Sequence, residues 1–208
     1  MARPDNSARF WDRIAEKYAR QPVADEAAYR TKLEMTRKHL RPDMDLLEIG
    51  CGTGSTALVH APHVRSIRAV DVSPAMIAIA RGKAADAGIG NVTFEEGAVG
   101  TLDIADASYD MVLALSLLHL VGDWEGLIAS AHLWLKPGGL FVTSTPCLSD
   151  TMPAMRYVLP LLRLFGKAPR IEFFSLDELK KAHRDAGLEI VEELTPGKGK
   201  ASFLIAQR

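Results

Sequence analysis

The sequence LLEIGCGTGS, residues 46–55, decides the fold of this 208-residue chain. Its first half is mainly apolar, and glycines follow at positions 50, 52 and 54. An apolar run that stops at a glycine cluster is typical of a buried strand that turns sharply into a helix. Glycine tolerates positive φ and has no Cβ, so a ligand can lie directly against the backbone of such a turn. The stretch therefore predicts a strand followed by a ligand-binding loop.

Further strand and helix patterns alternate on the C-terminal side of this loop. Apolar or alternating runs predict strands at residues 66–71, 91–95, 109–118 and 139–145,. Helical patterns separate them, and Lys136-Pro137-Gly138-Gly139 predicts a turn before the last of these strands,. Strands that alternate with helices form a mostly parallel sheet with helices on both faces. We therefore expect a doubly wound α/β fold, whose ligands bind at the carboxyl ends of the strands.

The two ends of the chain add to this core. Residues 1–41 carry helical patterns and predict an N-terminal helical cap over a core at residues 42–145,. Ser175 and Glu178 have the spacing of a capping box, which predicts a helix to about residue 186,. Residues 188–194 and 201–206 predict a closing antiparallel strand pair,. Residues 146–174 interrupt the alternation, and we interpret them as a substrate-side insertion. Residues 1–208 are thus expected to form a single domain, ending in a C-terminal region at 175–208.

Composition excludes several classes of protein. The formal net charge of −1 argues against a whole-surface basic field for nucleic acid,. Two cysteines do not make a disulfide framework, and the charged N-terminal residues lack the apolar core of a signal peptide,. No segment approaches the ~20 apolar residues of a membrane span. We expect a cytoplasmic protein, either a monomer or a homodimer. His60 and His63 are interpreted as surface residues without a metal, because no acidic residue adjoins them,.

One acidic residue stands at a distance that fits a nucleoside. Asp71 follows Gly50 by 21 residues and ends the next predicted strand. A carboxylate at that place can accept hydrogen bonds from both ribose hydroxyls. The glycine spacing is GxGxG, which differs from the dinucleotide pattern GxGxxG and from the phosphate-binding pattern GxxxxGK[ST],. The loop and Asp71 together thus indicate a nucleotide-like ligand, which the glycine spacing alone does not identify.

Five segments together resemble a known family. They read LLEIGCGTGS at 46–55, AVDVSPAMI at 69–77, NVTFEEG at 91–97, YDMVLALSLLHLV at 109–121 and LKPGGLFV at 135–142. In this order they are similar to the class I S-adenosylmethionine-dependent methyltransferases, of the small and broad type 11 kind. The resemblance implies a Rossmann-like, mostly parallel seven-stranded sheet with a reversed final strand. It also implies the cofactor S-adenosylmethionine, which leaves as S-adenosylhomocysteine.

The resemblance also implies roles for the matching residues. The methionine part of the cofactor would lie against Glu48, Gly50, Gly52 and Gly54. The ribose would be held by Asp71, with Val72 beside it and Met76 packed on the adenine. The adenine edge would adjoin Gly97, Ala98 and Val99, and the sulfonium would lie near Leu115 and Ser116. Many relatives carry an acidic residue where this chain has Ala98, so backbone groups or Glu96 would serve instead. Tyr18 resembles an N-terminal tyrosine that reaches the cofactor, although it can equally be a core residue.

The sequence gives less specific signals for the residues that would bind the methyl acceptor. His119, just beyond the fourth strand, is either a general base or a packed histidine that orients the cofactor. Between Asp150 and Glu172 the chain has basic but no acidic residues, namely Arg156, Arg163, Lys167 and Arg170. With the apolar residues around them, these favour a small lipophilic or anionic methyl acceptor, or weak contact with an acidic membrane surface. An ordinary amphipathic packing helix is the alternative.

Three functions remain open at this point. The first is methyl transfer from S-adenosylmethionine to a small molecule, where the sulfonium is already activated and the protein mainly aligns the reactants. The second is a nicotinamide-dependent oxidoreductase, which the GxGxG spacing and the absence of a Tyr-x-x-x-Lys pair near the predicted site count against. The third is a cofactor-binding or partner-binding protein on the same fold without catalysis.

Overall fold

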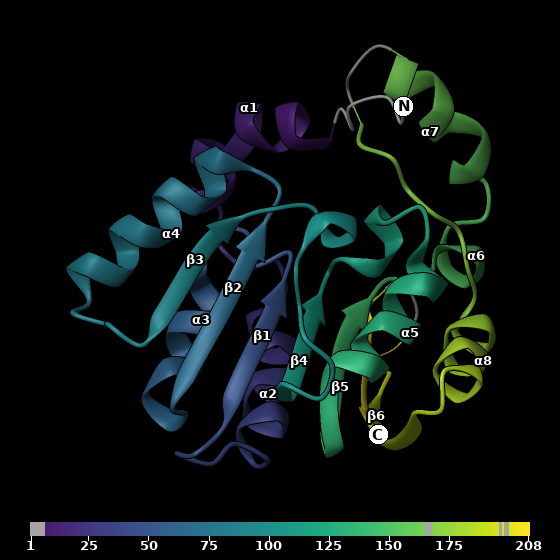
Figure 1. The fold of residues 1–208 in the computed structure, drawn as a ribbon. Helices are drawn as coiled ribbons and strands as arrows, with labels where there is room; N and C mark the ends of the chain where they lie inside the picture. The colour runs from purple at the N-terminus through teal and green to yellow at the C-terminus, as the bar shows by residue number, and fades with distance from the viewer. Residues whose placement is uncertain (1–6, 165–167, 196, 198–199) are drawn as a thin grey trace.

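A computed structural model of the chain describes residues 7–164, 168–195, 197 and 200–208. Its strands form one seven-stranded sheet in the order β3-β2-β1-β4-β5-β7-β6 (Figure 1). The strands are β1 (Asp45–Ile49), β2 (Ser66–Asp71), β3 (Val92–Glu96), β4 (Tyr109–Leu115), β5 (Leu135–Thr145), β6 (Glu189–Leu194) and β7 (Ser202–Gln207). Neighbouring strands from β3 to β5 are parallel, whereas β7 is antiparallel to both β5 and β6. This confirms the predicted doubly wound fold with a reversed final strand.

Helices cover both faces of the sheet. On one face lie α2 (Glu26–Arg37), α3 (Ser55–His60) and α4 (Pro74–Asp86), and their apolar residues join one core cluster with the sheet. On the other face lie α5 (Trp124–Trp134) and α8 (Leu176–Asp185), which join a second cluster. Short 3-10 turns occur at η1 (Ala61–His63), η2 (Val99–Thr101) and η3 (Leu118–Leu120). The sheet is therefore buried on both sides, which explains the near-continuous apolar character of its central strands.

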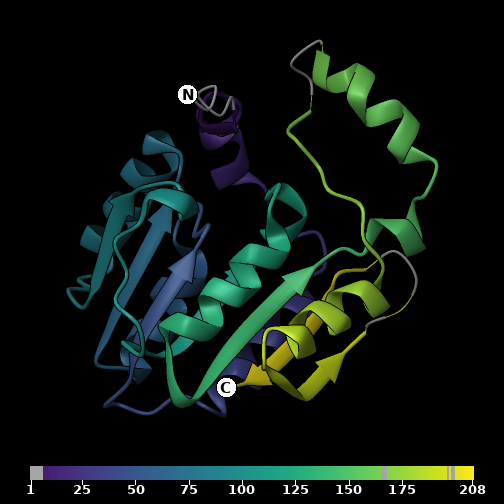
Figure 2. The ribbon, with the colours of Figure 1, turned by 45° about the vertical axis from the view of Figure 1, so that its right-hand side comes forward.

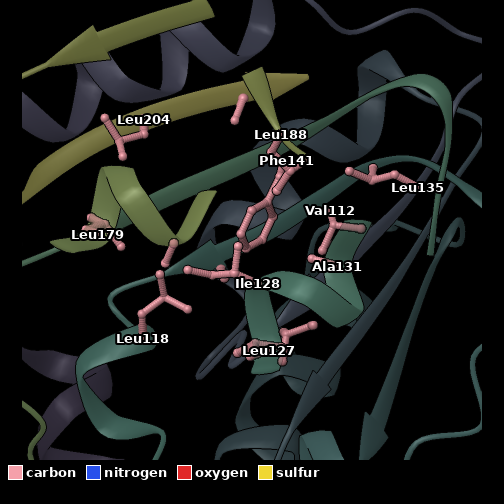
Figure 3. Packing of buried hydrophobic residues seen from close by; sticks show 14 of the residues in the cluster. Val112, Leu118, Leu127, Ile128, Ala131, Leu135, Phe141, Leu179, Leu188 and Leu204 are labelled. Atoms are coloured by element: carbon pink, nitrogen blue, oxygen red, sulfur yellow. The ribbon is translucent and has the colours of Figure 1, made fainter. Parts of the chain in front are cut away.

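The second cluster is centred on a strand residue. Figure 3 shows the Phe141 ring of β5 directed toward Ile128 of α5, with Leu179 of α8 and Leu204 of β7 nearby. All four side chains are fully buried. Burying a side chain of this size contributes about 1.5–3 kcal/mol relative to leaving it in water. This packing holds β5 and the following chain in place, and so supports the carboxyl end of the sheet.

Two predicted boundaries differ from the structure. β4 ends at Leu115 and not at residue 118, because Ser116 has a φ of 56° and turns the chain out of the strand. The apolar run continues because Leu118 returns to the core with no exposed surface. The predicted turn at 136–139 lies inside β5, where Gly138 has a φ of 77° and the pairing with β4 shifts between Tyr109 and Met111.

Three helices lie beyond the carboxyl end of the sheet. There, α1 (Ser7–Arg20) lies next to α4, while α6 (Leu148–Thr151) and α7 (Met155–Leu164) belong to the segment between β5 and α8. Both views show α7 well away from the sheet and from α1 (Figures 1 and 2). α7 continues through Pro160, which the sequence left open. Lys167, one of the basic residues that the sequence assigned to the acceptor side, lies outside the described residues. No helix in the described part of the chain is long and apolar enough to cross a membrane.

Candidate functional site

The glycine loop between β1 and α3 takes a conformation that side chains rarely adopt. Gly50, Gly52 and Gly54 have φ values of 68°, 53° and 74°. A Cβ on Gly54 would lie 2.7 Å from the Phe94 ring, and a Cβ on Gly50 would lie 2.7 Å from Leu117 Cδ1. A Cβ on Gly52 would have Cε1 of Tyr18 as its nearest neighbour, at 4.0 Å. Gly50 and Gly54 thus permit neighbouring side chains to pack directly on the loop backbone. Gly52 has more room, on the side that faces Tyr18.

Glu48 lies under this loop as a buried carboxyl group that lacks a full set of partners. It is 3% exposed, and its Oε2 has no hydrogen-bond partner among the described residues. Burial, with the nearby Asp71 charge, raises the pKa of Glu48 to about 8. A buried polar atom without a partner requires an explanation, because such atoms are nearly always hydrogen-bonded. Glu48 therefore fits a ligand that carries a hydrogen-bond donor or a positive charge, such as an amino group.

Asp71 ends β2 and contacts the same loop. Its Oδ2 accepts a hydrogen bond from the Gly52 N–H at 2.8 Å, and its Oδ1 accepts one from the Ser73 N–H at 2.9 Å. Burial raises its pKa, although these bonds act in the opposite direction. Each carboxylate oxygen keeps a second lone pair, so the group can still accept bonds from a diol. The sequence predicted Asp71 at the end of the second strand, and in the structure this residue is also in direct contact with the glycine loop.

The residues predicted to surround a base adjoin Asp71. Val72 is partly exposed beside it, whereas Met76 is 2% exposed and its N–H donates to Ser73 Oγ at the start of α4. On the β3 side, the Gly97 N–H donates to the Asp71 carbonyl at 3.0 Å. Two further predicted residues, Ala98 and Val99, follow at the start of η2, where Ala98 is exposed. The structure thus brings these residues together along one side of the carboxyl end of the sheet.

Tyr18 lies at the site and in neither of the two apolar core clusters described for the chain. Its ring would be the nearest group, at 4.0 Å, to a Cβ placed on Gly52, and it stacks edge-on against Trp11 with ring centroids 6.2 Å apart. Burial raises the pKa of Tyr18, and the neighbouring Asp71 and Tyr29 raise it further. The side chain still exposes a large surface, with the residue 46% accessible. Tyr18 is therefore placed to cover a ligand on the loop.

His119 lies on the opposite side, beyond the ends of β4 and β5. Its Nδ1 is 3.1 Å from Thr145 Oγ1, and burial lowers its pKa to about 4. The imidazole is therefore neutral at pH 7, so it can accept a proton but is a weak base in this environment. Its carbonyl accepts a hydrogen bond of 2.7 Å from the Glu172 N–H, which ties the segment after α7 to this corner. Leu115, partly buried, ends β4 just before it.

Three further residues adjoin the site, and none of them is among the predicted catalytic or cofactor-binding residues. Asp12 of α1 accepts a hydrogen bond from Ser73 Oγ at 2.6 Å. Tyr29 of α2 lies 3.3 Å from Thr56 Oγ1, and Lys32 donates to Ser144 Oγ at 2.8 Å. Burial lowers the pKa of Lys32. The i, i+3 spacing of Tyr29 and Lys32 puts them on one helix face, and this spacing is a signal in the sequence that could have grouped them.

The interpretation of His60 as a surface residue was wrong. It is 1% exposed, and burial lowers its pKa to about 4. The reason is that α3 packs this face against the sheet, where Ala57 and Ala61 join the core. No cluster of His, Cys, Asp or Glu side chains in the described ranges could hold a metal ion. The expectation that the histidine pair binds no metal therefore stands as a prediction.

The sheet is mostly parallel, a glycine loop without lysine follows β1, and an acidic residue ends β2. These features together define a class of nucleoside-binding Rossmann-like proteins. Within that class, similarity to known proteins identifies the family. The family model described as a methyltransferase domain matches residues 16–193. The chain therefore belongs to the S-adenosylmethionine-dependent methyltransferase family.

Relatives in this family carry several names. Demethylmenaquinone methyltransferase of Geobacillus kaustophilus is 26% identical over 213 residues, covering 88% of each chain. A ubiquinone biosynthesis O-methyltransferase of Methylobacterium nodulans is 28% identical, over 72% of this chain and 61% of its own length. The uncharacterized methyltransferase YcgJ of Bacillus subtilis is 30% identical over 49% of this chain and 40% of its own length. The chain thus spans less than two thirds of the last two relatives.

Solved structures share the fold. Geranyl diphosphate C-methyltransferase from Streptomyces coelicolor, in complex with S-adenosylhomocysteine, has a TM-score of 0.70 at 18% identity, covering 86% of this chain and 79% of its own. The [4+2]-cyclase SpnF has a TM-score of 0.77 at 18% identity, covering 99% of this chain and 96% of its own. At such identities the likeness establishes the fold alone.

Proposed function

We propose that this protein transfers a methyl group from S-adenosylmethionine to a small-molecule acceptor. The observation that carries the proposal is the pair of carboxyl groups at the glycine loop. Glu48 is buried and one of its oxygens has no hydrogen-bond partner in the described part of the chain, and Asp71 accepts a hydrogen bond from the Gly52 backbone. An amino group and a ribose diol are the ligand features that such a pair would recognise. Family membership makes S-adenosylmethionine the ligand that carries both.

The donor side of the site would work by alignment. Glu48 and the glycines Gly50, Gly52 and Gly54 would hold the methionine part, and Asp71 would hold the ribose. The base would lie among Val72, Met76, Gly97, Ala98 and Val99, with Tyr18 covering the loop and Leu115 near the reacting end. The bound cofactor supplies an activated methyl group, so positioning can contribute about 7–11 kcal/mol of the barrier.

The acceptor would be lipophilic or anionic and would bind between the end of β5 and residues 146–174. Two observations support this. Exposed apolar side chains gather on α7, where Tyr157 and Leu164 are each 79% exposed. In addition, Lys32 stands at the end of β5 with a third donor that is not used by Ser144 Oγ or the Ala201 carbonyl,. Relatives named for demethylmenaquinone and for ubiquinone biosynthesis are consistent with a small organic acceptor.

His119 is proposed to act at the acceptor. Its neutral imidazole, held through Nδ1 by Thr145, can accept a hydrogen bond from an acceptor hydroxyl or amine. With a pKa of about 4 it would assist deprotonation only when the acceptor is itself acidic,. His119 would then orient the acceptor more than it would act as a strong base.

The wider assignments are proposals on the same grounds. We propose that residues 1–208 act as one methyltransferase domain in the cytoplasm, as a monomer or homodimer without nucleic acid. In this division residues 1–41 are the cap, 42–145 bind the cofactor, 146–174 select the acceptor, and 175–208 complete the sheet.

Calorimetry of the purified protein tests the function directly. S-adenosylmethionine and S-adenosylhomocysteine are titrated separately, with NAD as the third ligand. We expect both adenosyl compounds to bind and NAD not to bind. Binding of NAD alone would refute the proposal. Methyl transfer is then measured with a labelled donor over a panel of phenols, carboxylic acids and prenylated quinols.

A second candidate function is a reaction other than methyl transfer on the same fold. SpnF, which is named for a [4+2] cyclisation, covers nearly the whole chain at a TM-score of 0.77. Binding of S-adenosylmethionine without turnover across the acceptor panel would favour this candidate, or a cofactor-binding protein without catalysis. Turnover of any acceptor would exclude both for this chain.

A further inference from the structure

Helix α1 is fastened to the rest of the molecule by a carboxylate. Asp12 Oδ1 accepts one hydrogen bond from Ser73 Oγ at 2.6 Å and another from the Ala75 N–H at 3.2 Å. Ser73 is the N-cap of α4 and has no exposed surface. Asp12 thus supplies an acceptor and a negative charge to the N-terminus of a 13-residue helix, where both are favourable,.

The same N-cap also contacts the proposed ribose ligand. The Ser73 N–H donates to Asp71 Oδ1 at 2.9 Å, while Ser73 Oγ accepts a hydrogen bond from the Met76 N–H at 3.2 Å. Three hydrogen bonds of Ser73 therefore connect α1, Asp71 and the first turn of α4. The docking of α1 and the groups that would hold the adenosine thus share one residue, Ser73.

α1 also carries Tyr18, six residues beyond Asp12 and therefore about 9 Å further along the helix axis. The Tyr18 ring covers Gly52 and stacks edge-on against Trp11, which precedes Asp12 in the helix. Figure 1 shows α1 at the carboxyl end of the sheet, next to the first turns of α4. Among the described elements, α4 is the one that α1 packs against most extensively. The position of Tyr18 over the loop thus depends on the contact between α1 and α4.

We propose that Asp12 is a positioning residue for S-adenosylmethionine: it docks α1 on the N-cap of α4 and so holds Tyr18 over the glycine loop. This inference rests on the proposed function, because it assumes that the adenosyl ligand lies between Asp71 and Tyr18. Asp12 does not contact the ligand. It slows the departure of the ligand by keeping the covering helix closed.

The test measures the dissociation of S-adenosylhomocysteine by stopped flow, with tryptophan fluorescence as the signal. Asp12→Ala is compared with Asp12→Asn, whose amide oxygen can still accept both bonds, and with Glu16→Ala. Glu16 is a matched control because it is an exposed carboxylate of the same helix that pairs only with Arg20 among the described residues. We expect Asp12→Ala to raise the dissociation rate about tenfold, Asp12→Asn about twofold to threefold, and Glu16→Ala less than twofold.

Hydrogen exchange over residues 7–20, without ligand, provides an independent readout. Asp12→Ala should lose protection in α1, while the protection of β1 and β4 and the melting temperature of the core stay close to those of the parent. Equal dissociation rates for Asp12→Ala and Glu16→Ala would overturn the proposal. So would a faster dissociation with unchanged α1 protection, since the effect would then not pass through the helix. If the parent protein bound no adenosyl compound, the proposed function would fail and the cofactor-positioning role with it. Loss of α1 protection would then support the docking contact alone.

Discussion

The loop after β1 and the segment between β5 and α8 lie at the same end of the sheet, yet they are built differently. In the loop, a Cβ on Gly50 or Gly54 would come within 2.7 Å of a packed side chain. In the segment, Tyr157 and Leu164 of α7 are each 79% exposed. The loop is therefore closely packed at two of its glycines, whereas α7 offers surface that is not committed to the core.

This difference corresponds to the two halves of the proposed reaction. A donor that is always the same can be bound by backbone groups and buried carboxyls, which tolerate little change. An acceptor can differ from protein to protein, so its binding surface is placed on a connection whose sequence does not determine the sheet. Substitutions in the loop and at Asp71 should therefore have large effects on folding or on cofactor binding, and substitutions on α7 should have small ones.

Gly54→Ala should have the largest effect on folding. Alanine at a φ of 74° is strained, and its Cβ would lie 2.7 Å from the Phe94 ring and 2.9 Å from Ala80 Cβ. Strain and overpacking together should lower the free energy of unfolding by about 2–5 kcal/mol. Urea denaturation measures this. Gly88→Ala is the control, because its φ is 64° but no atom lies within 4 Å of the added Cβ. An equal loss in both variants would show that packing around the loop is not restrictive.

The sequence predicted the elements of the sheet and the helix caps well. The apolar run before Gly50 predicted β1, the spacing placed Asp71 at the end of the next strand, and Ser175 and Glu178 formed the expected capping box. Each of these signals is local, or repeats at a distance that the βαβ unit imposes. The parallel sheet with its reversed final strand followed from the order of such signals.

The contacts that the sequence could not predict join distant parts of the chain. Asp12 bonds to Ser73 across 61 positions, and Lys32 bonds to Ser144 across 112. Neither pair has a characteristic local pattern, because their proximity depends on how α1 and α2 dock on the finished sheet. His60 was misjudged for the same reason, since its burial depends on which face of α3 meets the sheet.

Asp71→Ala should weaken the binding of S-adenosylmethionine strongly. It would remove two hydrogen bonds to a charged acceptor, each of which contributes about 1.5–3 kcal/mol. The variant would also release the Gly52 and Ser73 N–H groups from their partner. Isothermal titration calorimetry measures the loss. Asp86→Ala, an exposed carboxylate at the end of α4, should leave the affinity unchanged. Unaltered binding by Asp71→Ala would refute its role at the ribose.

Acid should destabilise the folded protein through the buried His60. Burial lowers the pKa of His60 to about 4, below its unfolded value, so the unfolded chain binds more protons between pH 6.5 and 4. The stabilising contribution of neutral His60 is therefore present above pH 6.5 and is lost as the pH falls through this window. We expect a loss of about 1–2 kcal/mol between pH 7 and 5.

Calorimetric melting of His60→Leu checks this loss. The variant should have a flatter stability profile over the same range of pH. Val59→Ala, which changes an exposed residue of the same helix that does not titrate, should retain the slope of the parent protein. A slope that is the same in His60→Leu and in the parent would assign the acid sensitivity to other groups.

Substitutions on α7 should have the smallest effect on stability and the most selective effect on function. Replacing Tyr157 and Leu164 by serine removes exposed apolar surface only, so the free energy of unfolding should change by no more than about 0.5 kcal/mol. The affinity for S-adenosylmethionine should also stay constant, while the KM for a lipophilic acceptor from the panel should rise. Leu133→Ser, on the 49% exposed Leu133 of α5, is the control that should leave this KM unchanged. A parallel fall in cofactor affinity would instead make α7 part of the cover over the donor, and the contrast between the two regions would no longer separate donor from acceptor.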